Sequence, residues 1–347
     1  MLKLTYRLSR GTTRITLGNG AISSLKGLED SLVVCPRSLR NMASSRLHGS
    51  FEIIEIPEGE ESKALDTVVT ILDKLVDGGF KRTSRLISFG GGTASDVAGL
   101  AASLYLRGIS YTSIPTTLLA MVDAALGGKN GVNYRGVKNM LGTFYSPSEI
   151  IVDTSLVGEM PHNLVEDGIG EIAKYATIMD GELYGFLMAN QMDSILDDAE
   201  KTEYLISRCV SDKMDLVSQD EFDLEGKRVI LNFGHTFGHA LEGVSEFSIG
   251  HGHAVLGGML LETDYAAGNG LMNLETKEGL HALIRHLGFS TREEDYLPGL
   301  RTELLKYITS DKKSTRHSIR LPLPEEIGIP KVCEVELSSI SDYLGHH

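Results

Sequence analysis

Four of the eleven histidines of this 347-residue chain lie close together, between His235 and His253. His235 and His239 are four residues apart, so they would share one face of a helix. An isolated histidine is usually a packing or surface residue, but this density favours a metal site. Two histidines and one carboxylate, with a position left open for substrate, are typical ligands of a catalytic zinc ion. Spacing alone therefore predicts His235, His239 and one of His251 and His253 as ligands.

A carboxylate that suits such a site lies in the string Gly168–Lys174, where Glu171 and Lys174 are three residues apart. On a helix this pair shares one face, and on a surface it would contribute well under about 1 kcal/mol. The neighbours Ile169 and Ile172 are apolar, however, which favours a buried position. A buried carboxylate needs a partner, and a metal ion is one. Glu171 is therefore the best candidate for the carboxylate ligand.

A glycine-rich segment follows an apolar run that ends at Phe89 and continues as GGGTASDVAG. Glycines let a backbone approach a pyrophosphate closely, and the free N–H groups of a helix N-terminus attract its charge. The alternative is a tight strand-to-helix connection that needs glycine for its geometry only. Because the string is not the strict GxGxxG pattern, the local sequence leaves both interpretations open.

Polar residues continue downstream in otherwise small and apolar surroundings. The hydroxyls of Thr116 and Thr117 follow a predicted strand and would either bind a nucleotide or cap a helix, which is their commoner use. Asp123 comes next, and then Gly127-Gly128-Lys129 and Lys138-Asn139. In an acidic protein, lysines in such surroundings are placed to bind a phosphate or a carboxylate.

The elements that must position these residues change in type near the middle of the chain. Short β-rich runs at 31–34, 51–54, 85–88 and 149–152 alternate with helical periodicity, best seen over 62–76. This alternation predicts a Rossmann-like, mainly parallel sheet covered by helices. After about Met160 the helix-compatible stretches are 163–188, 193–217 and 251–268, with a strand-like piece at 318–323 that would form an edge. We therefore predict an α/β protein with an NAD-binding domain over 1–160 and a mostly α-helical domain over 161–347 that binds metal and substrate.

Composition limits the partners of the protein. A net charge of −14 argues against nucleic-acid binding, which needs a basic surface. No apolar run reaches the length of a membrane span or of a signal peptide, so we expect a cytoplasmic protein that does not bind membranes. Cys35, Cys209 and Cys333 are widely spaced and odd in number, which predicts reduced packing residues. The length suits two domains with a cleft between them.

Several motifs occur in one order between about Gly59 and Lys313. They are Gly59-Glu60-x-x-Lys63, the glycine triplet with Asp96, Tyr105-Leu-Arg107-Gly108, IPTTLLAMVD, GGKNGVN, Lys138-Asn139, GEIAK and Arg228-x-x-LNFGHTFGHALE. Together they resemble the 3-dehydroquinate synthase family, sugar-phosphate cyclases of the shikimate pathway. An ordered set of motifs is far more specific than any one of them.

The resemblance implies that Glu171, His235 and His251 hold a divalent metal, zinc or cobalt, and it moves His239 to the substrate phosphate. It assigns these further residues to the substrate: Asp123, Lys129, Asn139, Lys174, Lys213, Arg228, Asn232, and one of Lys312 and Lys313. It assigns these residues to NAD and to the hinge: Glu60, Lys63, Gly91, Gly92, Thr93, Asp96, Thr116, Thr117 and Lys138, with Lys129 shared. Arg107 resembles an arginine that reaches the site of a neighbouring subunit, which implies a homodimer.

The implied substrate is a small phosphorylated sugar acid, 3-deoxy-D-arabino-heptulosonate 7-phosphate. In the implied reaction NAD oxidises a ring hydroxyl, phosphate is eliminated, the hydride returns, the ring opens and an intramolecular aldol step closes the carbocycle. Rival interpretations are a 2-deoxy-scyllo-inosose synthase-like cyclase, a polyol-phosphate dehydrogenase and a nucleotide-binding regulator without catalysis. Lys138-Asn139, Lys213 and His239 favour the dehydroquinate interpretation, and no residue of the substrate set is missing.

Two positions depart from the family pattern. His251-Gly252-His253 stands where the family usually has HGE, so His253 is an alternative ligand or a perturbing neighbour. Cys35-Pro36 stands near the place of the acidic residue expected to bind the adenine ribose. The second departure leaves open how tightly the protein binds NAD and which nucleotide it prefers.

Overall fold

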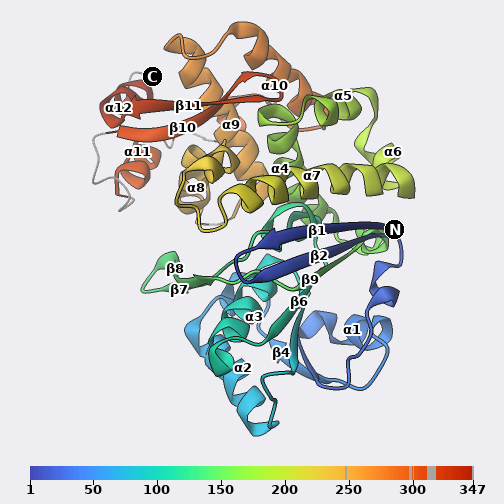
Figure 1. Cartoon of the computed structure of the whole chain (residues 1–347). Helices are drawn as coiled ribbons and strands as arrows, with labels where there is room; N and C mark the ends of the chain where they lie inside the picture. The colour runs from blue at the N-terminus through green and yellow to red at the C-terminus, as the bar shows by residue number, and fades with distance from the viewer. Residues whose placement is uncertain (247, 297–298, 300, 311–317, 346–347) are drawn as a thin grey trace. The chain divides into compact units, whose positions relative to one another are not determined.

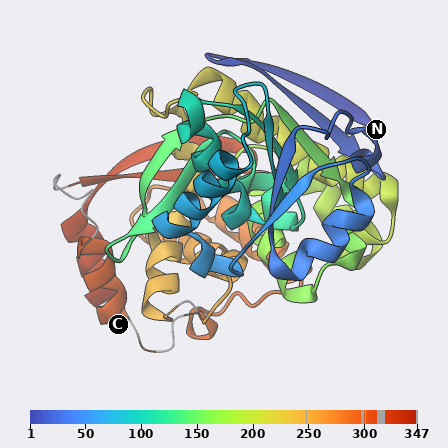
Figure 2. The ribbon, with the colours of Figure 1, turned by 90° about the horizontal axis from the view of Figure 1, so that it is seen from below.

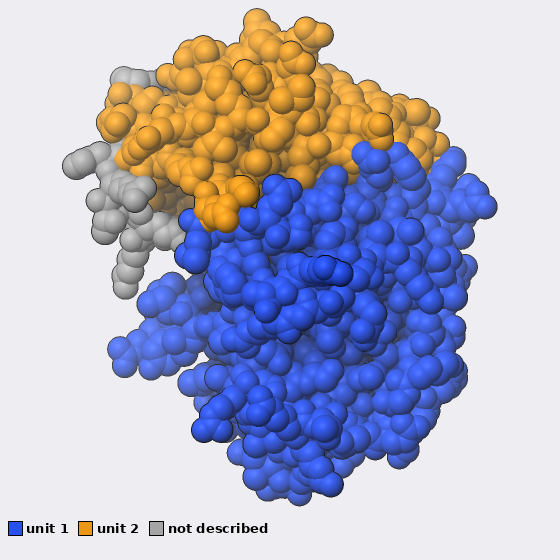
Figure 3. Space-filling model, viewed as in Figure 1, with its two compact units in different colours: residues 1–161, 196–224 blue, residues 162–195, 225–347 orange. Residues whose placement is uncertain are grey.

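The computed structural model describes residues 1–246, 248–296, 299, 301–310 and 318–345. By their internal contacts they form two compact units (Figure 3). Unit 1 comprises Met1–Pro161 and Leu196–Leu224, and unit 2 comprises His162–Ile195 and Glu225–His347. The first change of unit follows Pro161, and residues 196–224 return to unit 1.

Unit 1 is built on a seven-stranded sheet of order β1-β2-β9-β6-β5-β3-β4 (Figure 1). Its strands are β1 Leu2–Leu8, β2 Gly11–Gly18, β3 Ser31–Pro36, β4 Glu52–Ile56, β5 Arg85–Gly90, β6 Ser110–Pro115 and β9 Glu149–Asp153. Only β1 and β2 pair in antiparallel fashion, and every other neighbouring pair is parallel. The predicted mainly parallel sheet is thus confirmed.

Helices cover this sheet because its central strands are apolar on both sides. Every residue of β3 is buried, as is typical of a parallel strand between two layers. The covering helices include α1 Arg40–Arg46, α2 Leu65–Asp77 and α3 Gly92–Leu104, and α2 and α3 lie side by side (Figures 1 and 2). Val68, Ile71 and Leu75 place one face of α2 in the core, as the helical periodicity predicted.

Two further elements complete unit 1. A hairpin of β7 Lys129–Tyr134 and β8 Val137–Phe144 forms a separate two-stranded sheet. The long helix α7 Ala199–Gln219 contacts β1 and a single π-helical turn at Ala120–Ala124. These contacts explain why α7 belongs to unit 1 although it follows the first helices of unit 2 in sequence.

Unit 2 is mostly helical, as predicted. Its helices are α4 His162–Ile178, α5 Gly181–Ala189, α6 Met192–Leu196 at the return to unit 1, α8 His235–Val244, α9 His251–Gly268, α10 Leu274–His286, α11 Arg301–Ser310 and α12 Leu337–Gly345. The strand-like piece at 318–323 begins β10 Ser318–Glu326, which pairs with β11 Ile329–Glu336 in a sheet of its own. Helix α9 is buried on nearly all sides and packs against both α4 and α8.

Short helical turns link these elements. They are Ala21–Ser24, Arg37–Leu39, Gly59–Ser62, Tyr105–Arg107, Thr154–Glu159, Lys227–Asn232 and Glu293–Asp295. Within the described part of the chain, every helix is too short or too polar to cross a membrane.

Candidate functional site

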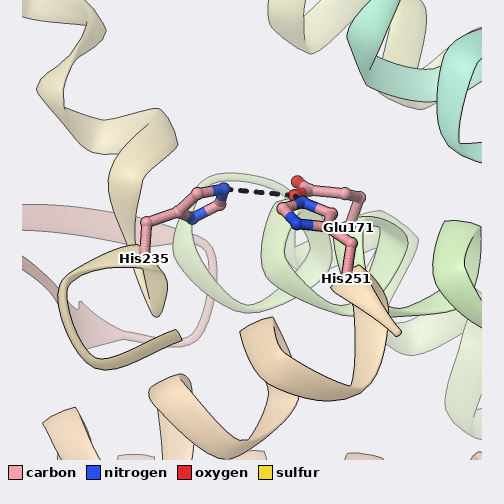
Figure 4. Close-up of side chains that lie close together, drawn as sticks. All are labelled: Glu171, His235 and His251. Carbon is pink, nitrogen blue, oxygen red and sulfur yellow. Dashed lines mark hydrogen bonds and ion pairs between the residues drawn. The ribbon is translucent and has the colours of Figure 1, made fainter. Parts of the chain in front are cut away.

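Three helices of unit 2 bring Glu171, His235 and His251 together (Figure 4). Glu171 lies within α4, and the two histidines are the first residues of α8 and α9. Oε1 of Glu171 lies 3.3 Å from Nε2 of His235 and 3.0 Å from Nε2 of His251. One ligand atom from each residue lies within 4.8 Å of the others, which gives a compact set of nitrogen and oxygen donors.

Glycines next to the three ligands allow this close approach. A Cβ atom on Gly170, beside Glu171, would lie 2.5 Å from the Cα of Gly252, beside His251. A Cβ atom on Gly258 of α9 would collide with the carbonyl oxygen of Gly234, beside His235. The backbone of α9 therefore touches α4 at Gly170 and the start of α8 at Gly234, and each of these two glycines adjoins a ligand. This geometry requires the glycines of the GEIAK, FGH and HGH strings.

Each histidine is oriented by a partner at its other ring nitrogen. Nδ1 of His235 lies 3.1 Å from the carbonyl oxygen of Phe233, and Nδ1 of His251 lies 3.2 Å from Oε1 of Glu242. With Nδ1 donating to these acceptors, Nε2 of each ring faces Glu171 and can bind a metal ion once it has lost its proton. Metal-binding histidines are commonly held in this way by a carboxylate or a carbonyl group.

The charges of the cluster suit a cation. Burial would raise the pKa of Glu171, but the Lys174 ammonium and the two histidines outweigh it and hold that pKa well below its usual range. Burial lowers the pKa of His251, yet hydrogen bonds to Glu171 and Glu242 outweigh it and raise the pKa to about 10. Without metal, His251 therefore carries a proton that a bound cation would displace. The donor set, its burial and its oriented rings fit a zinc or cobalt ion.

The other two histidines of the string lie outside this cluster in the described structure, so the ligand set that spacing predicted is wrong in His239. The His239 ring packs edge to face on His235 at 5.1 Å and is exposed. The His253 ring packs on Phe289 at 4.9 Å. His253, which stands where the family usually has a glutamate, therefore makes an aromatic contact.

Further basic and polar residues of unit 2 belong to the same segments as the ligands. Lys174 is buried, pairs with Glu171 and lies 4.8 Å from the Tyr175 ring. Arg228 is buried and Asn232 is exposed in the turn that precedes α8. Lys312 and Lys313 lie outside the described residues.

Unit 1 assembles a second polar network, around Lys63. Its ammonium lies 2.5 Å from Oδ2 of Asp96 and 2.5 Å from Oδ1 of Asn139. Asn133 extends the network, because its side chain donates to Glu60 at 2.6 Å and accepts the Asn139 N–H at 2.9 Å. Burial raises the pKa of Asp96 to about 6, against the opposing charge of Lys63. The structure thus joins residues that the resemblance assigned to nucleotide and substrate.

The remaining substrate candidates of unit 1 form two ion pairs. The Lys213 ammonium lies 2.8 Å from Oδ2 of Asp123 and also donates to its carbonyl oxygen at 2.8 Å. Lys129, at the start of β7, pairs with Asp223 at 2.6 Å. Sequence reasoning missed Asp223, because nothing in the motifs links it to a lysine 94 residues earlier.

The glycine turn after β5 serves close packing. Gly91 is the N-cap of α3, Gly92 and Thr93 begin the helix, and Cβ atoms on Gly91 and Gly92 would meet Thr117 at 3.2 Å and Ala124 at 2.8 Å. The Thr117 hydroxyl accepts the N–H of Ala120 at 3.2 Å, which is its capping use. Thr116 is buried beside it. Geometry therefore accounts for both glycines, and the free N–H groups at the start of α3 remain compatible with a phosphate.

The remaining predicted residues of unit 1 are Arg107 and Lys138, and a cavity lies near the end of β3. Arg107, in a left-handed conformation with φ 66°, lines a pocket of about 390 Å³ together with Arg10 and Arg82. Lys138 is exposed on β8. Where Cys35-Pro36 ends β3, Glu55 and Glu58 line a neighbouring cavity of about 600 Å³. Carboxylates from β4 and the loop that follows it thus stand near the place where the motif lacks one.

Comparisons with solved structures define the class of fold. The chain matches 2-deoxy-scyllo-inosose synthase, in a crystal structure titled as a complex with carbaglucose-6-phosphate, NAD+ and Co2+, at 24% identity and a TM-score of 0.84 over 99% of both chains. It matches 2-epi-5-epi-valiolone synthase from Streptomyces hygroscopicus, with NAD+ and Zn2+ bound, at 24% identity and a TM-score of 0.84 over 100% and 98% of the two chains. The chain therefore has the fold of these cyclases.

Sequence comparisons then identify the family. Residues 53–167 match the model for the 3-dehydroquinate synthase N-terminal domain, and residues 168–314 match the C-terminal one. A 3-dehydroquinate synthase of Sulfolobus acidocaldarius is 37% identical over 95% of this chain and 94% of its own length. One from Dictyoglomus turgidum is 41% identical over 81% and 78%. The chain belongs to the 3-dehydroquinate synthase family.

Proposed function

We propose that this protein is a 3-dehydroquinate synthase of the shikimate pathway, on which aromatic amino acid biosynthesis depends. It converts 3-deoxy-D-arabino-heptulosonate 7-phosphate into 3-dehydroquinate and inorganic phosphate, as a carbon–oxygen lyase. The observation that carries the proposal is the cluster of Glu171, His235 and His251 in a chain that is 37% identical to such synthases over 95% of its length.

NAD and a zinc or cobalt ion are the proposed cofactors. When bound, NAD would supply a reversible hydride acceptor, and the metal would supply a Lewis acid for the oxygen of the carbon that is oxidised. The solved structures of 2-deoxy-scyllo-inosose synthase with NAD+ and Co2+ and of 2-epi-5-epi-valiolone synthase with NAD+ and Zn2+ support this pair of cofactors. Glu171, His235 and His251 would hold the metal through Oε1 and the two Nε2 atoms.

The chain itself supplies binding, orientation and charge. In unit 2, Lys174, Arg228 and one of Lys312 and Lys313 provide cations that a phosphate and a carboxylate require. Asn232 and His239, both exposed beside the metal ligands, would hydrogen-bond the substrate. Lys174 pairs with the Glu171 ligand, so its ammonium is held next to the proposed metal site.

Unit 1 would contribute the nucleotide set and further substrate contacts. We assign to NAD the network of Glu60, Lys63 and Asp96, the turn at Gly91–Thr93, the hydroxyls of Thr116 and Thr117, and Lys138. Asp123, Lys129, Asn139 and Lys213 are assigned to the substrate. Lys213 and Lys129 each form an ion pair with a carboxylate. A negatively charged substrate would displace that carboxylate or bind the lysine beside it.

Oligomeric state and location are part of the same proposal. The resemblance of Arg107 to an arginine that reaches the site of a neighbouring subunit supports a homodimer, and Arg107 lines a surface pocket of unit 1. The three cysteines are free and buried, which supports a reducing compartment such as the cytoplasm.

The proposal is tested by incubating the protein with metal, NAD and the heptulosonate phosphate. Phosphate release and the absorbance of NADH are then recorded together. A synthase releases phosphate without net NADH, whereas a dehydrogenase accumulates NADH in step with substrate. His235→Ala should abolish phosphate release, and His162→Ala, at an exposed position outside the cluster, should not. Absence of phosphate release from the wild-type protein, or NADH formed in equal amount, would refute the proposal.

A further inference from the structure

Both helices that begin with a metal-ligand histidine lack a capping side chain of their own. The N-cap positions of α8 and α9 are Gly234 and Gly250, and neither helix has a side-chain cap from its own N-cap residue. The first backbone N–H groups of a helix need acceptors, especially where they are buried. In this protein the acceptors come from other helices.

Glu262 supplies the acceptors for α8. It lies in α9, and its Oε2 accepts the N–H of Gly234 at 2.8 Å while its Oε1 accepts the N–H of Thr236 at 3.1 Å. These are the two residues on either side of His235. A single carboxylate therefore fixes the backbone before and after one metal ligand.

Asp167 does the same for α9. It lies in α4, one turn before Glu171, and its Oδ1 accepts the N–H of Gly252 at 3.0 Å. Gly252 follows His251 directly. Each histidine ligand is thus tied at its backbone to the neighbouring helix, α8 to α9 and α9 to α4.

Burying an ionisable side chain at residue 262 is unfavourable for folding stability, so stability alone does not explain this position. The side chain is fully buried, and burial raises its pKa to about 8 in spite of hydrogen bonds from the backbone of Gly234, Thr236 and Phe237. An N-cap residue such as serine or asparagine would satisfy such N–H groups without burying an ionisable side chain. Glu262 also lies 11 residues after His251, about three helical turns, so both residues occupy the same face of α9.

We propose that Glu262, together with Asp167, is a positioning residue for the metal centre, holding His235 and His251 in ligand geometry through their backbones. The inference rests on the metal centre of the proposed function. It does not depend on which substrate the enzyme converts. Metal sites tolerate errors of only about 0.2 Å in ligand distance, so a slack backbone at either histidine weakens binding.

The test uses metal binding by the full-length protein, without substrate. Glu262→Gln keeps the size of the side chain but places an amide N–H₂ against one of the two backbone donors. We expect its affinity for Zn²⁺, measured by competition with a chromogenic chelator, to fall roughly 10–100-fold. The visible absorption of the Co²⁺-loaded variant should also change, since that spectrum reports ligand geometry. Asp167→Ala, which removes the acceptor of the Gly252 N–H, should show the same two effects.

Asn273→Ala is the matched control. Asn273 is the N-cap of α10 in the same unit, where its Oδ1 accepts the Thr276 N–H at 2.7 Å, and α10 carries no ligand. Loss of this cap should lower the melting temperature of the metal-free protein and leave the Zn²⁺ affinity and the Co²⁺ spectrum unchanged. Glu262→Asp, which keeps the carboxyl group but shortens its reach, should lose less affinity than Glu262→Gln.

The outcomes separate the inference from the function on which it rests. If Glu262→Gln binds Zn²⁺ and Co²⁺ as the wild type does and loses only thermal stability, as Asn273→Ala does, Glu262 is a structural cap and the inference is overturned. If Glu262→Gln does not fold, the same comparison is made with Glu262→Asp, and an affinity equal to that of the wild type overturns it equally. A wild-type protein that binds metal tightly but releases no phosphate would refute the proposed reaction and leave this inference standing.

Discussion

Replacing Gly170 by alanine tests the claim that touching helix backbones set the geometry of the metal site. The new Cβ would lie 2.5 Å from the Cα of Gly252, and ordinary contact begins at 3.4 Å. Because both partners are backbone, α4 and α9 must separate locally by about 1 Å, since packed interiors leave no space to absorb the atom. Glu171 and Gly170 are adjacent, so Glu171 would move away from His251 by a similar amount.

The substitution should lower both the folding stability and the affinity for Zn²⁺. Overpacking of this kind usually costs about 1–3 kcal/mol of folding stability. A ligand displacement of about 1 Å is several times the tolerance of a metal site, so we expect Zn²⁺ affinity to fall at least about tenfold, or about 1.4 kcal/mol.

The assay compares Gly170→Ala with Gly185→Ala, a helical glycine of the same unit with open space around it. Urea unfolding of the metal-free proteins gives the stability, and chelator competition gives the affinity. Gly185→Ala should be neutral or more stable by up to about 1 kcal/mol, because alanine favours a helix, and should bind Zn²⁺ normally. Equal behaviour of the two variants would show that the contact between Gly170 and Gly252 does not control the site.

Three further outcomes are expected. His235→Ala should lose its bound metal, whereas His239→Ala should keep the metal and turn over slowly. Elemental analysis measures the metal, and phosphate release measures the turnover. Loss of metal from both variants would contradict the ligand assignment. Lys63→Met should destabilise the protein by about 1–3 kcal/mol and weaken NAD binding, because it leaves the partly buried Asp96 carboxylate without its partner. Lys74→Met breaks an exposed pair and should cost under about 1 kcal/mol. The pKa of His251 is raised above its unfolded value, so its contribution to metal-free stability should be complete below about pH 6.5 and lost as the pH rises toward 10. Unfolding of the wild type and of His251→Asn, measured across this pH range, would reveal the difference.

Local patterns predicted much of the fold. The periodicity over 62–76 corresponds to α2, and the β-rich runs correspond to β3, β4, β5 and β9, because burial of alternate or one-sided residues leaves a direct trace in the sequence. The assignment of residues 196–224 to unit 1 left no such trace. Helix α7 was expected as a helix, but its partners are decided by contacts with residues far away in the chain.

The ligands of the metal site, like the partners of α7, depend on contacts between residues that are far apart in the chain. Spacing placed His239 with His235 because residues four apart share a helix face, but α8 begins at His235 and only its first residue reaches the cluster. Glu171 and His251 join it because Gly170 and Gly252 allow α4 and α9 to touch, and no local pattern shows which glycines face one another. Family resemblance named the three residues, whereas Glu242 and Glu262 required the structure.

The central claim is that this chain performs an internally redox-balanced cyclisation at a metal held by Glu171, His235 and His251. The most direct measurement is the mass balance of a complete reaction with substoichiometric NAD. We predict one phosphate and one 3-dehydroquinate for each heptulosonate phosphate consumed, with the NAD recovered in its oxidised form. Substrate consumption that stops after one equivalent of NAD, with NADH accumulated, would contradict the account.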